Sequence, residues 1–366
     1  MISGKRPLDG VRIVEMDAIG PVPFAAMMLA DFGADVVRMA RPDAKAGSGF
    51  LLHRGRPSLA LDLKDEADRR TASEIIACAD VLLEGFRPGV MERLGLGPEP
   101  CLAANRKLVY ARLTGWGQDG PLATVAGHDL DYIALTGALR AIGPGEAAPP
   151  VPLNLLGDYG GGALFAVGGI LAALLHARAS GEGQVVDAAI TDGVAMLSTV
   201  VHSLMAAGRW RGERGTNTLD GGAPFYRCYR CADGEYVAVG ALEPQFFALL
   251  LAGLGISAER FVQRDQSCWA EMEAVFAEAF AGRPRSHWLE MFATTDACVQ
   301  PVLSFEEAPL HPHNRARGTY FERDGDWVPA PAPRLGTTPA VAGPPAWETK
   351  PADLLARWST TLPISP

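Results

Sequence analysis

The sequence predicts an α/β protein with two domains: a large Rossmann-like domain built on a mainly parallel sheet, and a smaller α+β domain. Strand and helix patterns alternate along about the first hundred residues, which is typical of parallel strands joined by crossover helices. A segment rich in Gly, Arg and Asn then precedes a hairpin pattern and a group of helices. The chain has 366 residues, and since a domain commonly holds roughly 100–200, its length agrees with this division.

The large domain is expected to begin with strands and helices in turn. Pro23 in the first turn and Gly33 after the last turn mark the ends of its first helix. Residues 160–175 form an uncharged apolar run of 16 residues. Because a membrane span takes roughly 18–20 residues, we expect a buried core helix there. Strands are predicted at residues 11–15, 34–39, 59–63, 80–84, 108–113 and 184–187, and helices at 23–32, 65–79, 128–139, 160–178 and 190–207.

The smaller domain is expected to open with a hairpin. Residues 225–231 and 236–240 flank Asp233-Gly234, a dipeptide typical of tight hairpin turns. Helices are predicted at about residues 244–254, 269–281 and 284–293, and the chain is rich in Pro from residue 328 onward. The expected division is a large domain over 1–207, a linker over 208–224, a small domain over 225–312, and a linker and tail over 313–366 that returns to the large domain.

Composition excludes several classes of protein. A hydrophobic fraction of 48% with 20% charged residues is that of a folded globular chain, not a disordered one. The net charge of −9 argues against a general nucleic-acid binder. Six irregularly spaced cysteines do not resemble a disulfide framework, and no targeting or membrane segment is recognised. We therefore expect a cytoplasmic protein with reduced thiols.

Positive charge is concentrated in the first third of the chain. Residues 1–112 hold 16 Lys and Arg against 15 Asp and Glu, whereas the rest holds 17 against 27. Because ligands of open parallel sheets bind at the carboxyl ends of the strands, basic residues there favour an anionic ligand such as a phosphate. Ordinary surface charge remains the alternative. The basic residues near predicted strand ends are Arg38, Arg41, Arg54, Arg56, Lys64, Arg87 and Arg93.

Two motifs carry no functional prediction. The turn after the first strand has one glycine, Gly20, where a dinucleotide-binding fingerprint needs three. Cys228 and Cys231 form a C-x-x-C, but on a strand positions i and i+3 point to opposite faces. We therefore expect neither a bound dinucleotide at that turn nor a metal or redox role for the cysteine pair.

Two acid–base candidates lie where helix patterns begin. Gly127, His128 and two aspartates precede one helix, and the positive end of the helix dipole would keep His128 neutral and able to act as a base. Asp158 is followed, after Tyr159, by three glycines at the start of the apolar helix. Glycines allow a ligand to approach the backbone closely. A structural role for His128 and an N-cap role for Asp158 remain open.

Taken together, the motifs resemble those of the α-methylacyl-CoA racemases, a branch of the family III CoA-transferases. The resemblance covers nearly the whole chain. It rests on residues 7–12, 30–37, 56–64, 84–90, 110–117, 127–132 and 154–162, and in the second domain on residues 219–226, 239–246 and 296–299.

This resemblance implies the site residues. The family's catalytic His falls on His128, its Asp on Asp158 and its supporting Glu on Glu243. Asp131 departs from the pattern, because the racemases have Asn there; a carboxylate beside His128 is expected to raise its pKa. The positions implied for binding the CoA thioester are Arg41, Leu61, Asp62, Leu63, Lys64, Gly85, Phe86, Arg87, Arg93, Gly127, Asp129, Leu130, Asp131 and Tyr132.

The implied activity is that of an isomerase of fatty acid and lipid metabolism. It would interconvert (2R)- and (2S)-2-methylacyl-CoA by removing the proton beside the thioester carbonyl and returning it on the opposite face of an enolate. Two groups on opposite faces meet this need, provided that burial raises the pKa of Asp158 towards that of His128. Glu243 would orient the His, and backbone N–H groups just after His128 would hold the enolate oxygen. No metal or organic cofactor is expected, since coenzyme A enters as part of the substrate.

The resemblance also implies an interlocked homodimer, in which Glu243 of one chain reaches His128 of the other. Two other functions stay open. A family III CoA-transferase would use Asp158 as a nucleophile that forms an acyl anhydride and a thioester. A non-catalytic acyl-CoA-binding protein would need none of the three matching residues.

Overall fold

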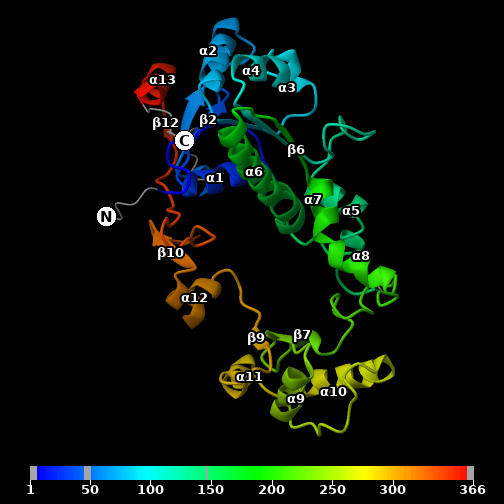
Figure 1. Cartoon of the computed structure of the whole chain (residues 1–366). Helices are drawn as coiled ribbons and strands as arrows, with labels where there is room; N and C mark the ends of the chain where they lie inside the picture. Colours follow the sequence, from blue (N-terminus) through cyan, green and yellow to red (C-terminus); the bar gives the residue numbers. More distant parts are fainter. Residues whose placement is uncertain (1–5, 45–50, 146, 361–366) are drawn as a thin grey trace. The chain divides into compact units, whose positions relative to one another are not determined.

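The computed structural model describes residues 6–44, 51–145 and 147–360, which form two compact units (Figure 1). Unit 1 takes in the chain up to Ala138, Pro152–Thr199 and the residues from Pro329 onward. Unit 2 comprises Leu139–Val151 and Val200–Val328. Each unit has a hydrophobic core of its own.

Unit 1 is built on a seven-stranded sheet with the strand order β12-β3-β2-β1-β4-β5-β6. The strand pairs run parallel, so the carboxyl ends of the strands meet at one edge. The central strands are buried on both faces, as expected of a parallel sheet covered by helices. The strands are β1 (Arg12–Met16), β2 (Asp35–Ala40), β3 (Pro57–Ala60), β4 (Val81–Glu84), β5 (Val109–Thr114), β6 (Val185–Ala189) and β12 (Trp347–Glu348).

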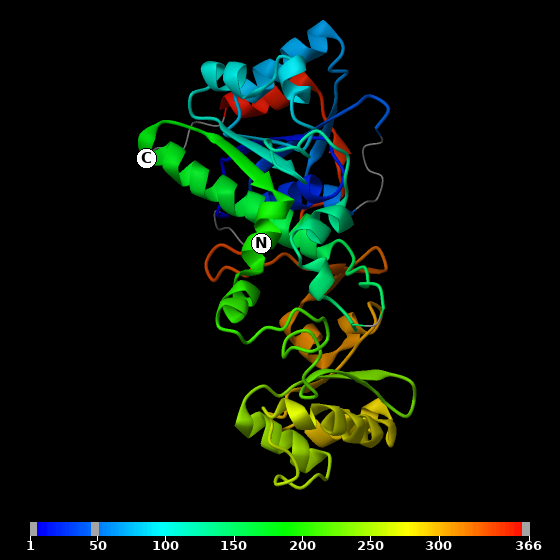
Figure 2. The same cartoon turned by 90° about the vertical axis from the view of Figure 1, so that its right-hand side faces the viewer.

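Helices cover both faces of this sheet (Figures 1 and 2). On one face α2, α4 and α13 pack over a core that includes Val14, Leu82 and Tyr110. On the other face α1 and α6 lie against the sheet and against each other. The α-helices associated with the sheet are α1 (Pro21–Asp31), α2 (Glu66–Ala77), α3 (Val90–Arg93), α4 (Pro98–Ala104), α5 (Asp129–Leu135), α6 (Leu164–Ser180), α7 (Ile190–Leu197) and α13 (Pro351–Thr360).

The C-terminal part of the chain joins the core of unit 1. β12 pairs in parallel with β3 at the end of the sheet. On α13, the Arg357 guanidinium donates two hydrogen bonds of 2.8 Å to the Asp35 carboxylate, and Trp358 Nε1 donates to the same carboxylate at 2.9 Å. The Trp358 side chain is buried in the core. The Arg357–Asp35 ion pair and the buried Trp358 ring together hold α13 against the sheet.

Three arginines expected to favour an anionic ligand are buried instead. Arg56 pairs with Glu15 at 2.7 Å, and Arg54 pairs with Asp31 at 2.6 Å. Arg38 lies 3.7 Å from an Asp17 carboxylate oxygen. The three arginine side chains are 1%, 5% and 4% exposed, so removing a partner would leave an uncompensated buried charge. Neither interpretation of these three arginines, as ligands of an anion or as ordinary surface charge, is therefore correct.

Several elements, among them α3, α4, α13 and β12, were not predicted, and some predicted elements differ from the observed ones in their bounds or continuity. The third strand begins at Pro57 and ends at Ala60, whereas residues 59–63 were expected. The helix expected over 128–139 ends at Leu135. The helix expected over 190–207 is divided at Ser198 into α7 and α8 (Thr199–Ala206). The Ser198 hydroxyl donates to the Val194 carbonyl, and side-chain bonds of this kind compete with regular helix geometry.

A π-helix (Leu155–Ala163) runs directly into α6, so the helical segment Leu155–Ser180 has 26 residues. By length and composition this segment is apolar enough to cross a membrane. Half of its most apolar window is buried inside the protein, where Ile170 and Leu174 face the core. Core helices of soluble proteins have the same composition, and α6 packs against β5 and β6.

Unit 2 contains a three-stranded antiparallel sheet, ordered β7-β8-β9, backed by helices. Its core is rich in aromatic rings; Phe225 lies edge-on to Trp269, and Tyr229 stacks on Phe280. The elements are β7 (Tyr226–Arg230), β8 (Tyr236–Gly240), α9 (Pro244–Gly253), α10 (Trp269–Ala281), α11 (Arg285–Phe292), β9 (Val299–Pro301) and α12 (Pro312–Arg317). A two-stranded sheet of β10 (Tyr320–Arg323) and β11 (Asp326–Pro329) follows.

Candidate active site

The candidate site lies in unit 1, where segments that follow the strands meet the start of α5 and the π-helix. β1, β4 and β5 are neighbours in the parallel sheet, so the loops after them leave from one edge. Binding sites of open α/β sheets lie at this edge. α5 and the π-helix pack against each other, and α1 also contacts the π-helix. This packing brings His128 and Asp158 into one region.

His128 immediately precedes α5 in extended backbone conformation, and its side chain is exposed. Its backbone N–H donates to the Asp131 carboxylate at 2.9 Å, and the Asp131 N–H donates to the His128 carbonyl at 2.9 Å. This reciprocal arrangement fixes the first turn of the helix. Asp131, the departure from the racemase pattern, therefore contacts the main chain of His128.

Asp129, the next residue, is only 8% exposed and connects α5 to the π-helix. Its Oδ2 accepts a hydrogen bond of 2.6 Å from the backbone N–H of Asp158. Gly157 lies so close to the same carboxylate that a Cβ at that position would overlap Oδ2. The other oxygen, Oδ1, is buried and has no hydrogen-bond partner among the described residues.

Asp158 is half-buried near the start of the π-helix. Burial raises the pKa of its carboxyl, and the nearby charge of Asp129 raises it further. A 3.4 Å hydrogen bond from Asn154 Nδ2 and the proximity of His128 act in the opposite direction. The net result is a pKa of Asp158 above its ordinary value, as acid–base exchange with a His requires.

Glycines allow the π-helix to pack closely. A Cβ at Gly193, on α7, would overlap the carbonyl of Gly161. Gly20, directly before α1, lies so close that a Cβ there would be 3.0 Å from Asp158 Oδ2. A π-helical turn is uncommon and is often found at functional sites. Here it carries Asp158 into the region between α1 and α5.

Tyr132 packs beneath the first turn of α5. Its hydroxyl donates to the Gly127 carbonyl, and its ring meets Trp116 edge-on with centroids 4.7 Å apart. Burial raises the pKa of Tyr132 most, and the charges of Asp158 and Asp131 raise it further. The charge of Arg87 lowers it. These electrostatic effects place Arg87, from the loop after β4, in the same region as Tyr132 and both aspartates.

The cations predicted to bind CoA are exposed at strand and helix ends. Arg41 follows β2, Lys64 follows β3, Arg87 follows β4, and Arg93 ends α3. Of the other positions implied for CoA, Phe86 and Leu63 are half-buried, whereas the Leu61 side chain belongs to the core. Only the backbone of Leu61 is therefore available to contact a ligand.

Sequence reasoning missed the residues that hold the loop after β4. Glu84 is fully buried, and its Oε2 accepts a 2.7 Å hydrogen bond from the Phe86 N–H. Arg112 Nε donates to Glu84 Oε1, and Arg112 Nη1 donates to Glu92, both at 2.8 Å. The sequence signal that could have indicated this pair is a Glu at the end of one apolar strand, Glu84 of β4, and an Arg within the next, Arg112 of β5.

Glu243 belongs to unit 2, where it is exposed directly before α9. Burial raises the pKa of the Cys298 thiol, and the charge of Glu243 raises it further, so the two side chains are near each other. His128 and Asp158 belong to unit 1. In the C-x-x-C pair, Cys228 is exposed and Cys231 is buried, in agreement with the prediction that they point to opposite faces.

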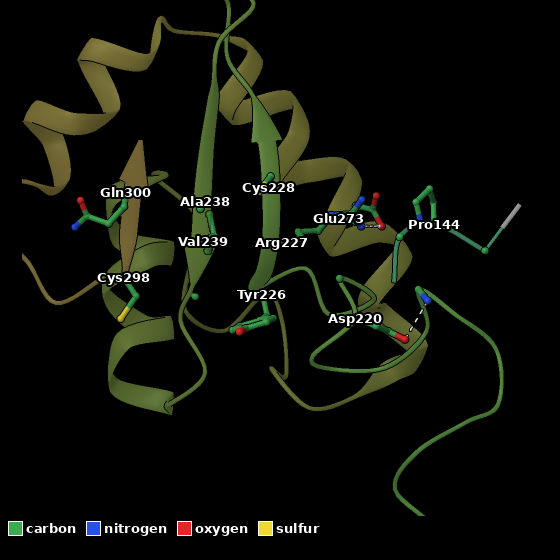
Figure 3. Close-up of a pocket in the computed structure, with 15 residues that line it drawn as sticks. Pro144, Asp220, Tyr226, Arg227, Cys228, Ala238, Val239, Glu273, Cys298 and Gln300 are labelled. Carbon is green, nitrogen blue, oxygen red and sulfur yellow. Dashed lines mark hydrogen bonds and ion pairs between the residues drawn. The ribbon is translucent and has the colours of Figure 1, made fainter. Parts of the chain in front are cut away.

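Unit 2 also has an open pocket of about 940 Å³ on its sheet (Figure 3). Tyr226, Cys228 and Ala238 line it from the strands, and Arg227 forms a 2.5 Å ion pair with Glu273 at its border. Asp220 closes another side and accepts the Gly215 N–H. The residues that line this pocket include none of the predicted site residues.

The chain is similar to known proteins over most of its length. The profile of the family described as CoA-transferase family III matches residues 8–356. Alpha-methylacyl-CoA racemase of Mus musculus is 51% identical over 337 residues, which cover 91% of this chain and 88% of that protein. The Homo sapiens protein of the same name is 46% identical over 336 residues, with the same coverage. Succinyl-CoA:glutarate CoA-transferase of Mus musculus is 31% identical over 259 residues, 67% of this chain and 59% of that protein.

Solved structures share the fold. The Mycobacterium tuberculosis protein Rv3272 matches with a TM-score of 0.79 and 26% identity, covering 94% of this chain and 98% of its own. A CAIB/BAIF family protein from Brucella suis matches with a TM-score of 0.82 and 23% identity, covering 98% and 100%. The latter likeness concerns the fold alone.

Proposed function

Since this chain belongs to CoA-transferase family III, we propose that it is a racemase that interconverts the (2R)- and (2S)-epimers of 2-methylacyl-CoA thioesters. The observation that carries this proposal is 51% identity to alpha-methylacyl-CoA racemase of Mus musculus across 91% of the chain. The reaction removes the proton beside the thioester carbonyl, passes through an enolate, and returns a proton on the opposite face.

His128 and Asp158 are the two acid–base groups of this proposal. Their ordinary pKa values, about 6.5 and about 3.9, differ too widely for efficient exchange of roles. Burial of Asp158 reduces the difference by raising the pKa of its carboxyl. In each direction one group takes the α-proton while the other, in its protonated form, delivers a proton to the other face.

The enolate oxygen needs hydrogen-bond donors, and the first N–H groups of α5 are candidates. The N–H groups of Asp131 and Tyr132 already donate to the His128 carbonyl. This leaves the N–H groups of Asp129 and Leu130 to meet the substrate oxygen. The negative charge that develops there would be stabilised within one turn of His128.

The CoA portion of the substrate would lie along the carboxyl edge of the sheet in unit 1. Arg41, Lys64, Arg87 and Arg93 are exposed there and supply positive charge for its phosphates. The loop over residues 61–64 and the loop after β4 offer backbone groups. Coenzyme A enters as part of the substrate, and the proposed reaction requires no metal or organic cofactor.

We propose further that the enzyme is an interlocked homodimer, with each site completed by Glu243 of the partner subunit. His128 and Glu243 are both exposed in the single chain, which suits side chains that become covered on assembly. Glu243 would then accept a hydrogen bond from the His128 ring and fix its tautomer. The free cysteines suit a reducing compartment, and we propose the cytoplasm.

One assay tests this function. A single epimer of a 2-methylacyl-CoA is incubated with the protein in deuterated water without an acceptor acid. Racemase activity predicts loss of optical purity together with uptake of deuterium at the α-carbon. Retention of both configuration and the α-proton would reject the proposal.

A CoA-transferase is the second candidate, because relatives named as CoA-transferases are 31–35% identical over about two thirds of this chain. In that case Asp158 would attack the acyl-CoA carbonyl, release CoA thiolate and form an acyl anhydride. The His128 and Glu243 pair favours the racemase, since the transferase chemistry has no need of it. Transfer of CoA to added carboxylic acids, without epimerisation, would favour the second candidate.

A further inference from the structure

We propose that Asp129 is a positioning residue for the racemase reaction, because its carboxylate fixes the turn that carries Asp158 relative to the start of α5. This inference rests on the proposed function and deepens it. Asp129 directly follows His128, so one buried side chain connects the backbones that carry the two acid–base groups. The connection spans 29 positions in sequence and joins two separate helices.

The geometry leaves this contact little freedom. Asp129 Oδ2 accepts the Asp158 N–H at 2.6 Å, which is short for an N–H···O hydrogen bond. Hydrogen bonds to charged acceptors are shorter and stronger than neutral ones. Gly157, the residue before Asp158, lies so close to this carboxylate that a Cβ at that position would overlap Oδ2. The carboxylate therefore holds the amide of Asp158 and packs directly against Gly157 of the π-helix.

The arrangement has an energetic cost that a contact serving stability alone would not require. Asp129 Oδ1 is buried without a hydrogen-bond partner among the described residues, and a buried unsatisfied charged oxygen is unfavourable. The groups that face Asp158 are Asn154, His128 and Asp129, with Tyr132 close by. The charge of Asp129 is the one that raises the pKa of Asp158 in addition to burial. The contact thus sets both the position and the proton affinity of Asp158.

Position matters because proton transfer to opposite faces of a planar enolate depends on the placement of both groups. A displacement of about 1 Å at a reacting group can cost about 100-fold in rate. Without the Asp129 carboxylate, the Asp158 backbone would be held by the π-helix alone. The start of α5 would keep His128 in place through Asp131. The two groups would then lose their fixed relation while each remained present.

The test compares three variants in the epimerisation assay with the full-length protein. For Asp129→Ala we expect kcat to fall about 100-fold with KM changed less than about threefold. For Asp129→Asn, which keeps an oxygen acceptor, we expect a loss of less than about tenfold. Because this variant lacks the charge, the acidic limb of its pH–kcat profile moves to lower pH. Asp80→Ala is the control: Asp80 also accepts a backbone N–H, at 2.8 Å, but at the amino end of β4, and its kcat should stay within about twofold.

Hydrogen–deuterium exchange gives a readout that does not depend on activity. The amide of residue 158 should exchange about tenfold faster in Asp129→Ala than in the wild type or in Asp80→Ala. Unchanged exchange, or a kcat for Asp129→Ala equal to that of the control, would overturn the inference while the racemase function stands. A wild-type protein that does not epimerise overturns the proposed function; the exchange experiment then still decides whether Asp129 holds the Asp158 turn. If Asp129→Ala does not fold, Asp129→Asn carries both measurements.

Discussion

Gly20 and Asp158 approach each other so closely that a Cβ on the glycine would lie 3.0 Å from the carboxylate oxygen Oδ2. Gly20 has a φ of +82°, a backbone conformation that L side chains rarely adopt. It directly precedes α1, whereas Asp158 is on the π-helix, so the contact joins two elements far apart in sequence. Both the conformation and the close approach require glycine.

Replacing Gly20 with Ala should therefore damage catalysis as well as stability. The positive φ costs about 1 kcal/mol of unfolding free energy for an L residue, and the Cβ would push the Asp158 carboxylate from its place. We expect kcat to fall at least about tenfold, measured as epimerisation. Gly181→Ala is a matched control, because Gly181 has a φ of +79° and free space around it. That control should lose similar stability and keep its kcat; equal kcat in both variants would contradict the contact.

His128→Ala should reduce epimerisation by about two to four orders of magnitude, the usual contribution of a general acid–base group. Its exposed side chain packs little of the fold, so folding should be unaffected. Affinity for the CoA thioester, measured by calorimetry, should change less than about tenfold. Near-normal epimerisation in this variant would exclude the two-base scheme.

Arg41→Ala and Arg93→Ala should each raise KM more than they lower kcat. Both side chains are exposed at the edge where CoA phosphates are proposed to bind, and contacts of this kind act equally on substrate and transition state. Steady-state kinetics at low and high salt provide the measurement, since exposed charge pairs weaken as ionic strength rises. If KM is unchanged in both variants, the CoA phosphates bind elsewhere.

Glu84→Ala should destabilise unit 1 by about 3 kcal/mol, because the buried Arg112 guanidinium loses the buried carboxylate that pairs with it. The same change removes the acceptor for the Phe86 N–H, so KM for the thioester should rise as well. Glu182→Ala is the control: Glu182 also pairs with an arginine, Arg106, but both side chains are exposed. Urea unfolding should show a change of about 0.5 kcal/mol or less for the control. Equal losses in the two variants would argue against a structural role for Glu84.

The strands of unit 1 were predictable because buried parallel strands are continuous apolar runs. β1, β2, β4 and β5 lie within one or two residues of their predicted ranges. By contrast, β12 has two residues and β9 has three, too few for a pattern to be recognised. β12 exists as a strand because it pairs with β3, almost 300 positions earlier in the chain, and no local signal contains that contact.

The site shows the same division between local and long-range information. Residue type and helix position were enough to select His128 and Asp158 as candidates, although each had a structural alternative. The link between Asp129 and Asp158 depends on how α5 packs against the π-helix, which the local sequence does not determine. Charge alone also failed to separate exposed Arg41 from buried Arg56, because a guanidinium suits a phosphate and a buried carboxylate equally well.

Asp158 is the residue that the racemase and the transferase use differently, so it gives the sharpest test. Asp158→Asn removes one of the two bases and should abolish net turnover of both epimers. His128 remains, and it should still exchange the α-proton of the one epimer whose hydrogen faces it, because removal and return can occur on one face. Mass spectrometry of each separated epimer in deuterated water measures this exchange. Exchange in both epimers, or in neither, would contradict the assignment of one base to each face.

The wild-type protein allows the complementary measurement at Asp158. A racemase never forms a covalent bond to this carboxylate, whereas a transferase forms an acyl or CoA adduct that hydroxylamine converts to a hydroxamate. We expect no modified Asp158 after incubation with substrate and hydroxylamine. We also expect the acidic limb of the pH–kcat profile to lie above the ordinary carboxyl pKa of about 3.9, because burial raises the pKa of Asp158 and the ionised form is needed to accept a proton. A hydroxamate formed at Asp158 at the rate of turnover would show that the carboxylate acts as a nucleophile and that the protein is a CoA-transferase.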